Sequence, residues 1–327
     1  MSDVTLDMES DGYPAKVVVA LPLSPAQRLR LQATLPCTRF LWLDYGRAAA
    51  EDVADADVIV GSVDPALLAE TRRLRLLQLS SAGYDRYTDD VMPAGAALCC
   101  ATGAFGQAVS EHLFAMVLAQ LKKLPGYRDL QRSCEWGDLG PVRSLVGARV
   151  LVLGAGDIGT HLAQLFSAFG AHVDGVRSRE TAPHEPFERM GTLADLGELL
   201  PQADVVASVL PSNDATRGLA DEAFFAAMKR GAIFANAGRG DLVDQAALAA
   251  ALESGQLGGA CLDVTSPEPL PADDPLWNAP NCTITPHISG FFHLDVTLDN
   301  IVDIAAENLA HLASGEPLRN QVRPNSR

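Results

Sequence analysis

The sequence predicts an α/β protein with parallel sheets, built from two domains. Short apolar runs typical of buried strands alternate with segments of helical periodicity along most of the 327 residues. A glycine-rich turn directly follows the apolar run 150–153 and opens a helix, which is the arrangement of a βαβ unit. The length is sufficient for two domains that each bury a core of their own.

The composition limits the partners that we expect. A formal net charge of −16 and a pI near 4.7 argue against non-specific binding to nucleic acid or to anionic membranes. Residues 1 to about 15 are acidic and polar and predict a disordered tail, and no uncharged apolar run reaches the length of a membrane span. The six cysteines contain neither a CxxC pair nor a metal-ligand spacing. We therefore expect a cytoplasmic protein with reduced thiols and no metal site.

Five apolar runs in the first hundred residues predict a small parallel sheet, with strands at 16–21, 39–44, 56–61, 74–79 and 96–100. Helices are predicted between them, from Ser24 or Pro25 to Ala33 and at 64–70. The loop Ser80-Ser81-Ala82-Gly83-Tyr84-Asp85 would follow the fourth strand at its carboxyl end, where parallel sheets bind ligands through backbone N–H groups. A plain turn is an equally good interpretation of this loop from the residues alone.

The next segment, from Gly106 or Gln107 to Lys123, is predicted as a helix whose apolar side chains cover most of its circumference. Such a helix must be buried on more than one side. We therefore expect it to cross into the second domain, with part of it available to another subunit. A polar loop through Arg128, Trp136 and Pro141 is predicted to follow.

The glycine-rich turn reads Gly154-Ala155-Gly156-Asp157-Ile158-Gly159, and its helix is followed by a second strand at 172–176. In a dinucleotide-binding turn the first glycine permits the tight turn, the second lets the backbone approach a pyrophosphate, and the third lets helix and strand pack closely. The phosphates bind the unpaired N–H groups at the positive end of the helix. A bare GxGxxG also fits an ordinary turn, but here strand, helix, second strand and length all favour dinucleotide binding.

Four further strands are predicted at 205–209, 232–236, 260–263 and 283–285, with helices at 221–228 and 244–254 and a last helix at 291–312 before a polar tail. The carboxyl ends of parallel strands share one edge of a sheet, and the glycine-rich turn brings a cofactor to that edge. Each of these strands ends in a polar or irregular cluster: Leu210-Pro211-Ser212, Asn236 to Gly240, Asp263 to Pro269, and Thr285-Pro286-His287.

With these motifs in this order, the chain resembles the NAD(P)-dependent D-2-hydroxyacid dehydrogenases. The matching segments are 79–85, 154–159, 229–240, 262–264 with 268–271, and 285–287. The resemblance implies two Rossmann-like domains with a cleft between them. A doubly wound parallel-sheet dinucleotide-binding domain, 101–293, would be inserted in a smaller flavodoxin-like substrate-binding domain, 1–100 with 294–327. It also implies a homodimer that uses the helix up to Lys123.

The resemblance further implies a set of site residues. Arg239, Glu268 and His287 would be catalytic, and the backbone N–H groups of Ala82 and Gly83 would hold the substrate carboxylate. The cofactor would be bound by Gly154, Gly156, Asp157, Ile158, Gly159, Pro211 and Asp263, of which the last resembles the family's aspartate near the nicotinamide.

The three catalytic candidates suit the reduction of a 2-oxo acid. Arg239 carries a planar guanidinium that binds carboxylate and carbonyl oxygens in a fixed geometry. His287 can cycle a proton near neutral pH, and Glu268 would orient its ring and favour its charged form. Each also has an ordinary interpretation, as a solvated loop arginine, a surface histidine or a loop carboxylate. We expect the following to be structural or surface residues: Cys261, His112, His161, His172, His184 and His293.

The end of the strand at 172–176 indicates which cofactor is preferred. NAD-preferring units place Asp or Glu there to bind the ribose 2′-hydroxyl. Here the strand ends in Arg177-Ser178-Arg179, and Asp174 lies mid-strand, too early to reach the ribose. Because arginine accommodates a 2′-phosphate that a carboxylate would repel, the sequence favours NADP(H) over NAD(H). The alternative is that both arginines are solvated and either cofactor is accepted.

The short chain and the predicted NADP(H) make the resemblance strongest to glyoxylate/hydroxypyruvate reductases, which act on a small 2-oxo acid in the reductive direction. Glu268 argues against formate dehydrogenases, which resemble this family but use Gln there. A nucleotide-sensing co-repressor that resembles C-terminal binding protein is the alternative, because it keeps the same Arg, Glu and His. The acidic balance and the absence of long interaction tails favour the enzyme.

Overall fold

The computed structural model describes residues 13–322, so the predicted N-terminal tail lies outside the described residues up to position 12. The chain divides into two compact units, 1–104 with 294–327 and 105–293. The first unit extends to residue 104, whereas the predicted domain ended at residue 100. Two residues that were assigned to the tail are held in place: the carbonyl of Pro14 accepts from Thr38 Oγ1 (2.7 Å), and the N–H of Ala15 donates to Asp57 Oδ2 (2.8 Å).

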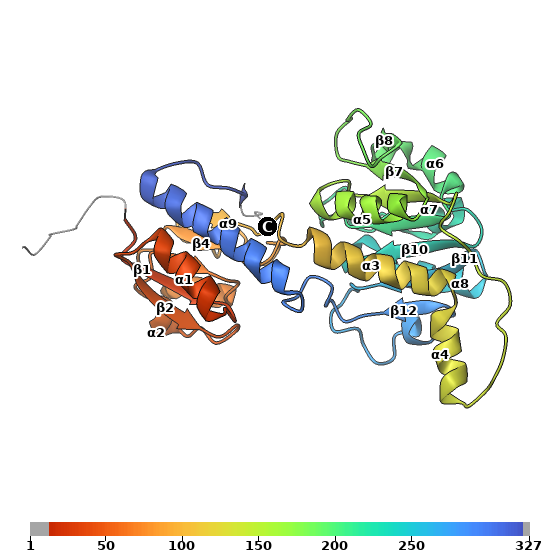
Figure 1. Cartoon of the computed structure of the whole chain (residues 1–327), viewed down its shortest axis with the longest axis horizontal. Coiled ribbons are helices and arrows are strands. Elements are labelled where there is room, and N and C mark those ends of the chain that lie inside the picture. Colours follow the sequence, from red (N-terminus) through yellow and green to blue (C-terminus); the bar gives the residue numbers. More distant parts are fainter. Residues whose placement is uncertain (1–12, 323–327) are drawn as a thin grey trace, which may run out of the picture. The chain divides into compact units, whose positions relative to one another are not determined.

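The smaller unit contains a six-stranded sheet in the order β13-β5-β4-β3-β1-β2 (Figure 1). Five strands are parallel, and β13 pairs antiparallel with β5. The sequence predicted a polar tail where β13 lies, which is wrong, because a two-residue strand has no pattern of its own and forms only through its pairing. The strands are β1 (Lys16–Ala20), β2 (Arg39–Leu43), β3 (Val58–Val60), β4 (Leu76–Gln78), β5 (Ala97–Cys99) and β13 (Gln321–Val322).

The helices of the smaller unit pack on this sheet around a core that includes Val18, Ile59 and Leu77. A capping box begins the first helix, because Ser24 Oγ accepts the N–H of Gln27 (3.3 Å) while the Gln27 side chain accepts the N–H of Ser24 (2.9 Å). The last helix begins at Asp295, later than predicted. The first and last helices lie side by side in Figure 1. The helices are α1 (Pro25–Thr34), α2 (Ala50–Val53), the 3₁₀ helix η1 (Pro65–Glu70) and α9 (Asp295–Ser314).

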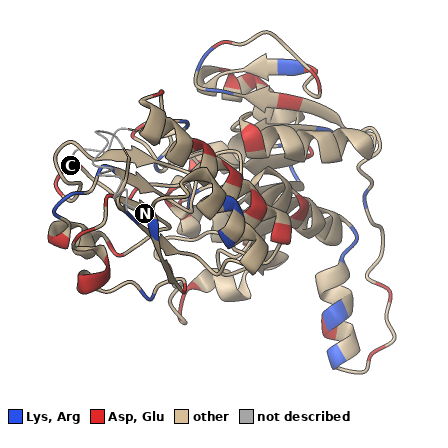
Figure 2. Cartoon of the chain, turned by 60° about the vertical axis from the view of Figure 1, so that its left-hand side comes forward, with Lys and Arg blue, Asp and Glu red and all other residues tan. Residues whose placement is uncertain are grey.

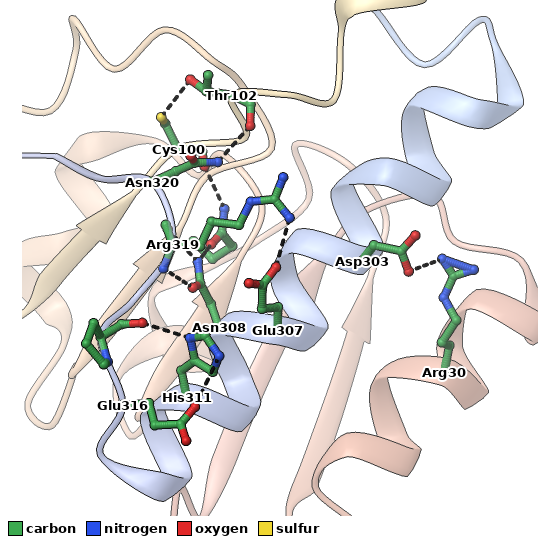
Figure 3. A network of polar contacts seen from close by, with 12 residues as sticks. Arg30, Cys100, Thr102, Asp303, Glu307, Asn308, His311, Glu316, Arg319 and Asn320 are labelled. Carbon is green, nitrogen blue, oxygen red and sulfur yellow. Dashed lines mark hydrogen bonds and ion pairs between the residues drawn. The ribbon is translucent and has the colours of Figure 1, made fainter. Parts of the chain in front are cut away.

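A polar network fixes the segment after α9 to the ends of β4 and β5 (Figure 3). The fully buried Asn308 donates from Nδ2 to Gln78 Oε1 (2.6 Å) and to the carbonyl of Arg319 (3.0 Å). Its Oδ1 accepts the N–H of Arg319 (2.7 Å), and the carbonyl of Asn320 accepts the N–H of Cys100 (3.1 Å). The C-terminal residues therefore complete a sheet that the N-terminal residues begin.

The larger unit contains a seven-stranded parallel sheet in the order β12-β11-β10-β9-β6-β7-β8. From β6 the chain passes to β7 and β8 on one side and then returns to β9 on the other, so the carboxyl end of β6 lies at a topological switch point, where such sheets bind ligands. The strands are β6 (Arg149–Leu153), β7 (His172–Val176), β8 (Arg189–Gly191), β9 (Val205–Ser208), β10 (Ala232–Asn236), β11 (Leu257–Leu262) and β12 (Cys282–Ile284).

Helices cover this sheet on both faces, around two apolar clusters. The longest of these helices is α3. It lies in the larger unit from its first residue, so it does not cross from one unit into the other, contrary to the expectation. Phe114 on α3 packs against Phe166 and Phe169, with ring centroids 5.3 and 4.8 Å apart, so packing within the unit accounts for its wide apolar surface. The helices are α3 (Gly106–Leu121), α4 (Leu124–Arg132), α5 (Asp157–Ala168), α6 (Leu196–Leu199), α7 (Glu222–Ala227) and α8 (Gln245–Glu253), with 3₁₀ turns η2 (Leu193–Asp195), η3 (Leu200–Gln202), η4 (Gly240–Leu242) and η5 (Pro275–Asn278).

The helix α4 corrects the prediction of a polar loop through Arg128. Lys123 has φ +56°, which is not a helical conformation, so it separates α4 from α3. Pro125 lies in the first turn of α4, where the missing N–H of proline costs no hydrogen bond. The segment opens with Leu124-Pro125-Gly126, and adjacent Pro and Gly are typical of a turn, so the sequence favoured a loop here. The structure also adds β8 and the short helix α6, which the sequence did not predict.

Candidate active site

The glycine-rich turn lies at the carboxyl end of β6. Gly154 has φ +101°, a conformation that L side chains rarely adopt, and it forms the tight turn. A Cβ on Gly159 would lie 2.1 Å from the carbonyl oxygen of Gly154, whereas a Cβ on Gly156 would meet nothing within 4 Å. The third glycine is therefore needed for helix–strand packing, and the second leaves the backbone open to a ligand.

The first turn of α5 begins at Asp157 and presents the N–H groups that a helix leaves without an internal partner. Ile158 follows in the same turn and is half-buried. The Asp157 side chain turns toward His161, with 3.6 Å between Oδ1 and Nδ1. The other carboxylate oxygen, Oδ2, is buried without a hydrogen-bond partner among the described residues.

The side chains of Arg177, Ser178 and Arg179 are exposed at the carboxyl end of β7. The N–H of Arg177 donates to the carbonyl of Gly191 (3.0 Å), which fixes this strand end to β8. Asp174 is buried and pairs with Arg149 Nη1 (2.9 Å) at the start of β6. Its carboxylate is thus engaged away from the strand end, as its mid-strand position predicted.

The loop after β10 carries Arg239 and is held by Asn236, the last residue of that strand. Asn236 Nδ2 donates to the carbonyl of Arg239 (2.9 Å), and Asn236 Oδ1 accepts the N–H of Gly238 (3.0 Å). The guanidinium of Arg239 donates from Nη1 to the carbonyl of Gly238 (2.8 Å) and is half-buried. The local backbone, and not only solvent, therefore sets the direction of this side chain.

Neighbouring loops explain the glycines on either side of Arg239. Close backbone packing requires both glycines. A Cβ on Gly238 would lie 2.4 Å from the carbonyl oxygen of Leu210, the residue before Pro211, and a Cβ on Gly240 would lie 1.9 Å from that of Thr265. The loops after β9, β10 and β11 are thereby drawn together, and Pro211 itself is exposed.

Glu268 and His287 form a hydrogen-bonded pair at this edge of the sheet. His287 Nδ1 lies 2.8 Å from Glu268 Oε2, and Glu268 Oε1 accepts the N–H of Thr265 (3.1 Å). Both side chains are partly exposed, by 48% and 39% respectively. Because a carboxylate can only accept, Nδ1 carries a proton and Nε2 remains to exchange one.

Asp263 holds the loop that contains His287. It follows β11, is fully buried, and accepts the N–H of His287 at its carbonyl (2.7 Å). Its carboxylate accepts from Thr285 Oγ1 (2.6 Å) and Ile288 N–H (3.1 Å) at Oδ1, and from Ser289 N–H (3.1 Å) at Oδ2. His287 itself has φ +52°, which these contacts support.

His112 on α3 reaches the same cluster, although the sequence analysis assigned it no role. Its Nε2 lies 3.0 Å from Thr285 Oγ1 and 3.7 Å from Asp263 Oδ1. No spacing in the sequence signals this contact, because His112 and Thr285 are 173 positions apart, with several elements between them. Only the packing of α3 on the sheet brings them together.

The remaining predicted site residues lie elsewhere. Ala82 and Gly83 belong to the smaller unit, in the loop after β4, where Ser81 Oγ donates to the carbonyl of Gly83 (2.7 Å). Cys261 is buried in the core of the larger unit.

Among residues 13–322, no group of three or more His, Cys, Asp or Glu side chains could hold a metal ion. In the same range, no helix has both the length and the apolar character needed to span a membrane.

Comparison with known proteins shows to which family this chain belongs. A family model described as D-isomer specific 2-hydroxyacid dehydrogenase, NAD binding domain, matches residues 114–289, more than half of the chain. The chain belongs to the D-isomer-specific 2-hydroxyacid dehydrogenases. As a member of this family it is an oxidoreductase that uses a nicotinamide cofactor and interconverts 2-oxo acids and 2-hydroxy acids. The predicted family, fold class and enzyme class are confirmed, and the co-repressor alternative finds no support.

Individual dehydrogenases of this family match nearly the whole chain. Glyoxylate/hydroxypyruvate reductase B of Klebsiella pneumoniae (strain 342) is 35% identical over 313 residues, which are 93% of this chain and 96% of that protein. A family member from Aeromonas salmonicida has a solved structure with a TM-score of 0.83 at 34% identity, covering 95% of this chain and 99% of that one. A dehydrogenase from Xanthobacter autotrophicus Py2, solved in complex with NADPH and MES, has a TM-score of 0.79 at 29% identity and covers 95% and 98%.

Proposed function

We propose that this dehydrogenase reduces small 2-oxo acids of the glyoxylate and hydroxypyruvate type, with NADPH preferred as the cofactor. The observation that carries the proposal is the 2.8 Å contact between His287 Nδ1 and Glu268 Oε2, beside the loop of Arg239. An acid, its orienting carboxylate and a cation are the groups that reduction of a 2-oxo acid requires.

Each of the three side chains has a separate task in this proposal. The cofactor supplies a hydride to the carbonyl carbon when it is bound. Arg239 binds the oxygens of the 2-oxo acid and withdraws charge from the carbonyl. His287 transfers a proton from Nε2 to the oxygen as it becomes a hydroxyl, and Glu268 orients the ring through its contact with Nδ1.

The glycine-rich turn fits a dinucleotide. Its second glycine, Gly156, faces open space, and Asp157 and Ile158 present N–H groups at the positive end of α5. We propose that these residues, together with Gly154, Gly159 and Pro211, bind the cofactor. The role of Asp263 near the nicotinamide is part of the same proposal, although its carboxylate already accepts three hydrogen bonds from the chain.

The preference for NADPH rests on the end of β7. Arg177 and Arg179 are exposed there, and neither forms an ion pair with a carboxylate of residues 13–322. Asp174, the acidic residue of the strand, is engaged by Arg149. Two uncommitted guanidinium groups and the Ser178 hydroxyl suit a 2′-phosphate and do not suit a bare ribose. That the Xanthobacter relative was solved with NADPH is compatible with this preference.

The substrate class is supported by the curated relatives. Several of them are named glyoxylate/hydroxypyruvate reductase B, and the one from Klebsiella pneumoniae matches over 93% of this chain. We further propose that the backbone N–H groups of Ala82 and Gly83 bind the substrate carboxylate. The half-buried loop that contains them lies at the carboxyl end of β4, where parallel sheets bind ligands.

A homodimer in the cytoplasm completes the proposal. The apolar surface of α3 gives it little support, because that surface is mostly buried in the larger unit. Better support comes from α4 and the segment after it, which project from the larger unit in Figures 1 and 2 and expose Leu124, Trp136 and Val142 by 55%, 106% and 50%. Six cysteines without disulfides favour a reducing compartment. Light scattering should give a dimer, and Trp136→Glu should shift it toward the monomer; a monomeric parent protein would exclude the dimer.

The activity is tested by mixing purified protein with NADPH or NADH and a panel of 2-oxo acids, while absorbance at the nicotinamide band is followed. We expect turnover of glyoxylate and hydroxypyruvate to exceed that of bulkier 2-oxo acids. His287→Gln should lower turnover strongly and leave NADPH binding nearly unchanged. A fully active His287→Gln variant would mean that another residue supplies the proton.

Cofactor preference is tested by kcat/KM for NADPH against NADH. A charge-assisted contact at an exposed site should give a preference of at least about ten-fold, and added salt should reduce it. Arg177→Asp should reverse the preference. Arg189→Asp is the matched control, because it makes the same charge change at the amino end of the neighbouring strand β8. Equal kcat/KM with both cofactors in the parent protein would refute the preference.

A further inference from the structure

The hydrogen-bond direction between His112, Thr285 and Asp263 follows from their chemistry. Thr285 has a single hydroxyl hydrogen, and a carboxylate oxygen, Asp263 Oδ1, lies 2.6 Å from its Oγ1. The other acceptor beside it, the sulfur of Met116, lies 3.8 Å away and accepts weakly. The hydrogen therefore goes to Asp263, and the hydroxyl oxygen can only accept from His112 Nε2, 3.0 Å away.

A proton on Nε2 of His112 makes the chain of contacts continuous. Nε2–H donates to Thr285, and Thr285 donates to Asp263. The carboxylate in turn accepts the backbone N–H groups of Ile288 and Ser289 (3.1 Å each), on the carboxyl side of His287. We propose that His112 and Thr285 are positioning residues, which fix the carboxylate of Asp263 and through it the loop that presents His287.

The burial of these groups explains why two further residues are needed to hold one carboxylate. Asp263 is fully buried, so water cannot replace a hydrogen bond that the protein fails to supply. The side chain of His112 is 25% exposed, and its Nε2 lies 3.7 Å from Asp263 Oδ1. Without Thr285 and His112, the carboxylate would be free to turn toward other donors, and Ile288 and Ser289 would lose their common acceptor.

The loop geometry links this network to catalysis. His287 has a left-handed backbone, φ +52°, that a residue with a Cβ adopts only when its surroundings impose it. Its N–H is held by the carbonyl of Asp263 (2.7 Å) and its successors are held by the carboxylate of the same residue. A small rotation of this loop would move Nε2 of His287 relative to the bound substrate, and proton transfer is sensitive to such displacement.

This inference rests on the proposed acid role of His287, and a first experiment measures the network without any turnover. Selective ¹⁵N-histidine labelling of the ligand-free protein gives signals from seven histidines, and His112→Gln assigns one of them by its loss. We expect His112 to be protonated at Nε2, either as the neutral tautomer or as the cation. A neutral His112 with its proton on Nδ1 would overturn the proposal, whatever the activity of the enzyme.

The second experiment is kinetic. Thr285→Val and His112→Leu should each lower kcat for 2-oxo acid reduction by about ten-fold, with KM for the 2-oxo acid and cofactor binding changed by less than about two-fold. The double variant should lose little more than the larger single loss, because both residues act through one carboxylate. Thr285→Ser keeps the hydroxyl and His112→Gln keeps an N–H donor at the position of Nε2, so both should recover most of the rate.

A matched histidine separates positioning from general stability. His172 begins β7 at the opposite, amino edge of the sheet and pairs with Glu188 (2.6 Å). His172→Leu should leave kcat unchanged. Unchanged kcat in His112→Leu, strictly additive losses in the double variant, or failure of the Ser and Gln variants to restore the rate would each contradict the proposal. If His287→Gln also remained active, the proposed function would fail; if only His287→Gln lost activity, the positioning network alone would fail.

Discussion

The side chains of His287 and Glu268 are joined by a 2.8 Å contact between Nδ1 and Oε2, although each is partly exposed to solvent. Exposed pairs are usually mobile and contribute little. Here the backbone restrains both partners, because Thr265 N–H donates to the second oxygen of Glu268 (3.1 Å) and the carbonyl of Asp263 holds the N–H of His287 (2.7 Å). The pair is thus arranged before any substrate binds.

The first prediction concerns this pair. Glu268→Ala should lower kcat for reduction by about 100-fold, because the ring of His287 loses the contact that orients it toward the substrate. Glu268→Gln should lose less, since its amide oxygen can still accept from Nδ1. Steady-state rates at saturating substrate measure both. Glu188→Gln is the control, because it removes a carboxylate from another histidine pair, His172–Glu188, and should leave kcat unchanged.

Two glycines of the same turn should respond differently to one methyl group. Gly159→Ala should destabilise the larger unit severely, because the added Cβ would lie 2.1 Å from a backbone carbonyl that cannot move aside. Gly156→Ala adds its methyl group to open space at an ordinary φ of −91° and should unfold like the parent. It should nevertheless weaken cofactor binding, measured by quenching of tryptophan fluorescence. Parent-like cofactor affinity in Gly156→Ala would indicate that the pyrophosphate lies elsewhere.

The buried Asn308 should be important for the stability of the smaller unit. Asn308→Ala leaves Gln78 Oε1 and both backbone groups of Arg319 without their partner, and should lower the free energy of unfolding by about 2–3 kcal/mol. Urea unfolding measures this in a background with Trp136 and Trp277 changed to Phe, so that Trp42 alone reports on the smaller unit. Asn300→Ala removes only one long contact (3.4 Å) and should cost much less. Equal losses in the two variants would contradict this role of Asn308.

Thiol reactivity should divide the six cysteines into two groups. Cys37 and Cys134 are exposed, whereas the others are buried or half-buried. Burial raises the pKa of Cys99 to about 12 and that of Cys282 to about 12, and it raises the pKa of Cys261 further. Since the thiolate is the reactive form, a disulfide reagent at pH 8 should modify two thiols quickly in the native protein and all six in urea. Cys134→Ser should reduce the fast group to one; a third fast thiol would show that a buried region opens.

Much of the fold could be predicted because its signals are local. Most strands of the larger sheet are short apolar runs, and the turn at 154–159 has glycines at a fixed spacing, so the order of these elements along the chain follows from the sequence. The contact between His287 and Glu268 was expected from the resemblance to the D-2-hydroxyacid dehydrogenases, and the structure places the two residues after the neighbouring strands β12 and β11.

The features that could not be predicted depend on contacts between distant segments. Gly238 and Gly240 are glycines because the loops after β9 and β11 approach them, and nothing beside Arg239 in the sequence indicates that approach. The helix α4 is nine residues long and begins with Leu124, Pro125 and Gly126, and the Pro-Gly pair favours a turn when the segment is considered alone. His112 reaches Thr285 only through the packing of α3, which no spacing along the chain encodes.

The discontinuity of the smaller unit has a consequence for biosynthesis. Residues 105–293 form the larger unit without interruption, so all seven of its strands can pair as soon as that stretch has left the ribosome. The first 104 residues emerge earlier, but α9, the Asn308 contacts and β13 arrive only with the last residues of the chain. Until residues 321 and 322 have emerged, the nascent smaller unit therefore has the edge of β5 unpaired, and that exposed edge is where a chaperone would be needed most.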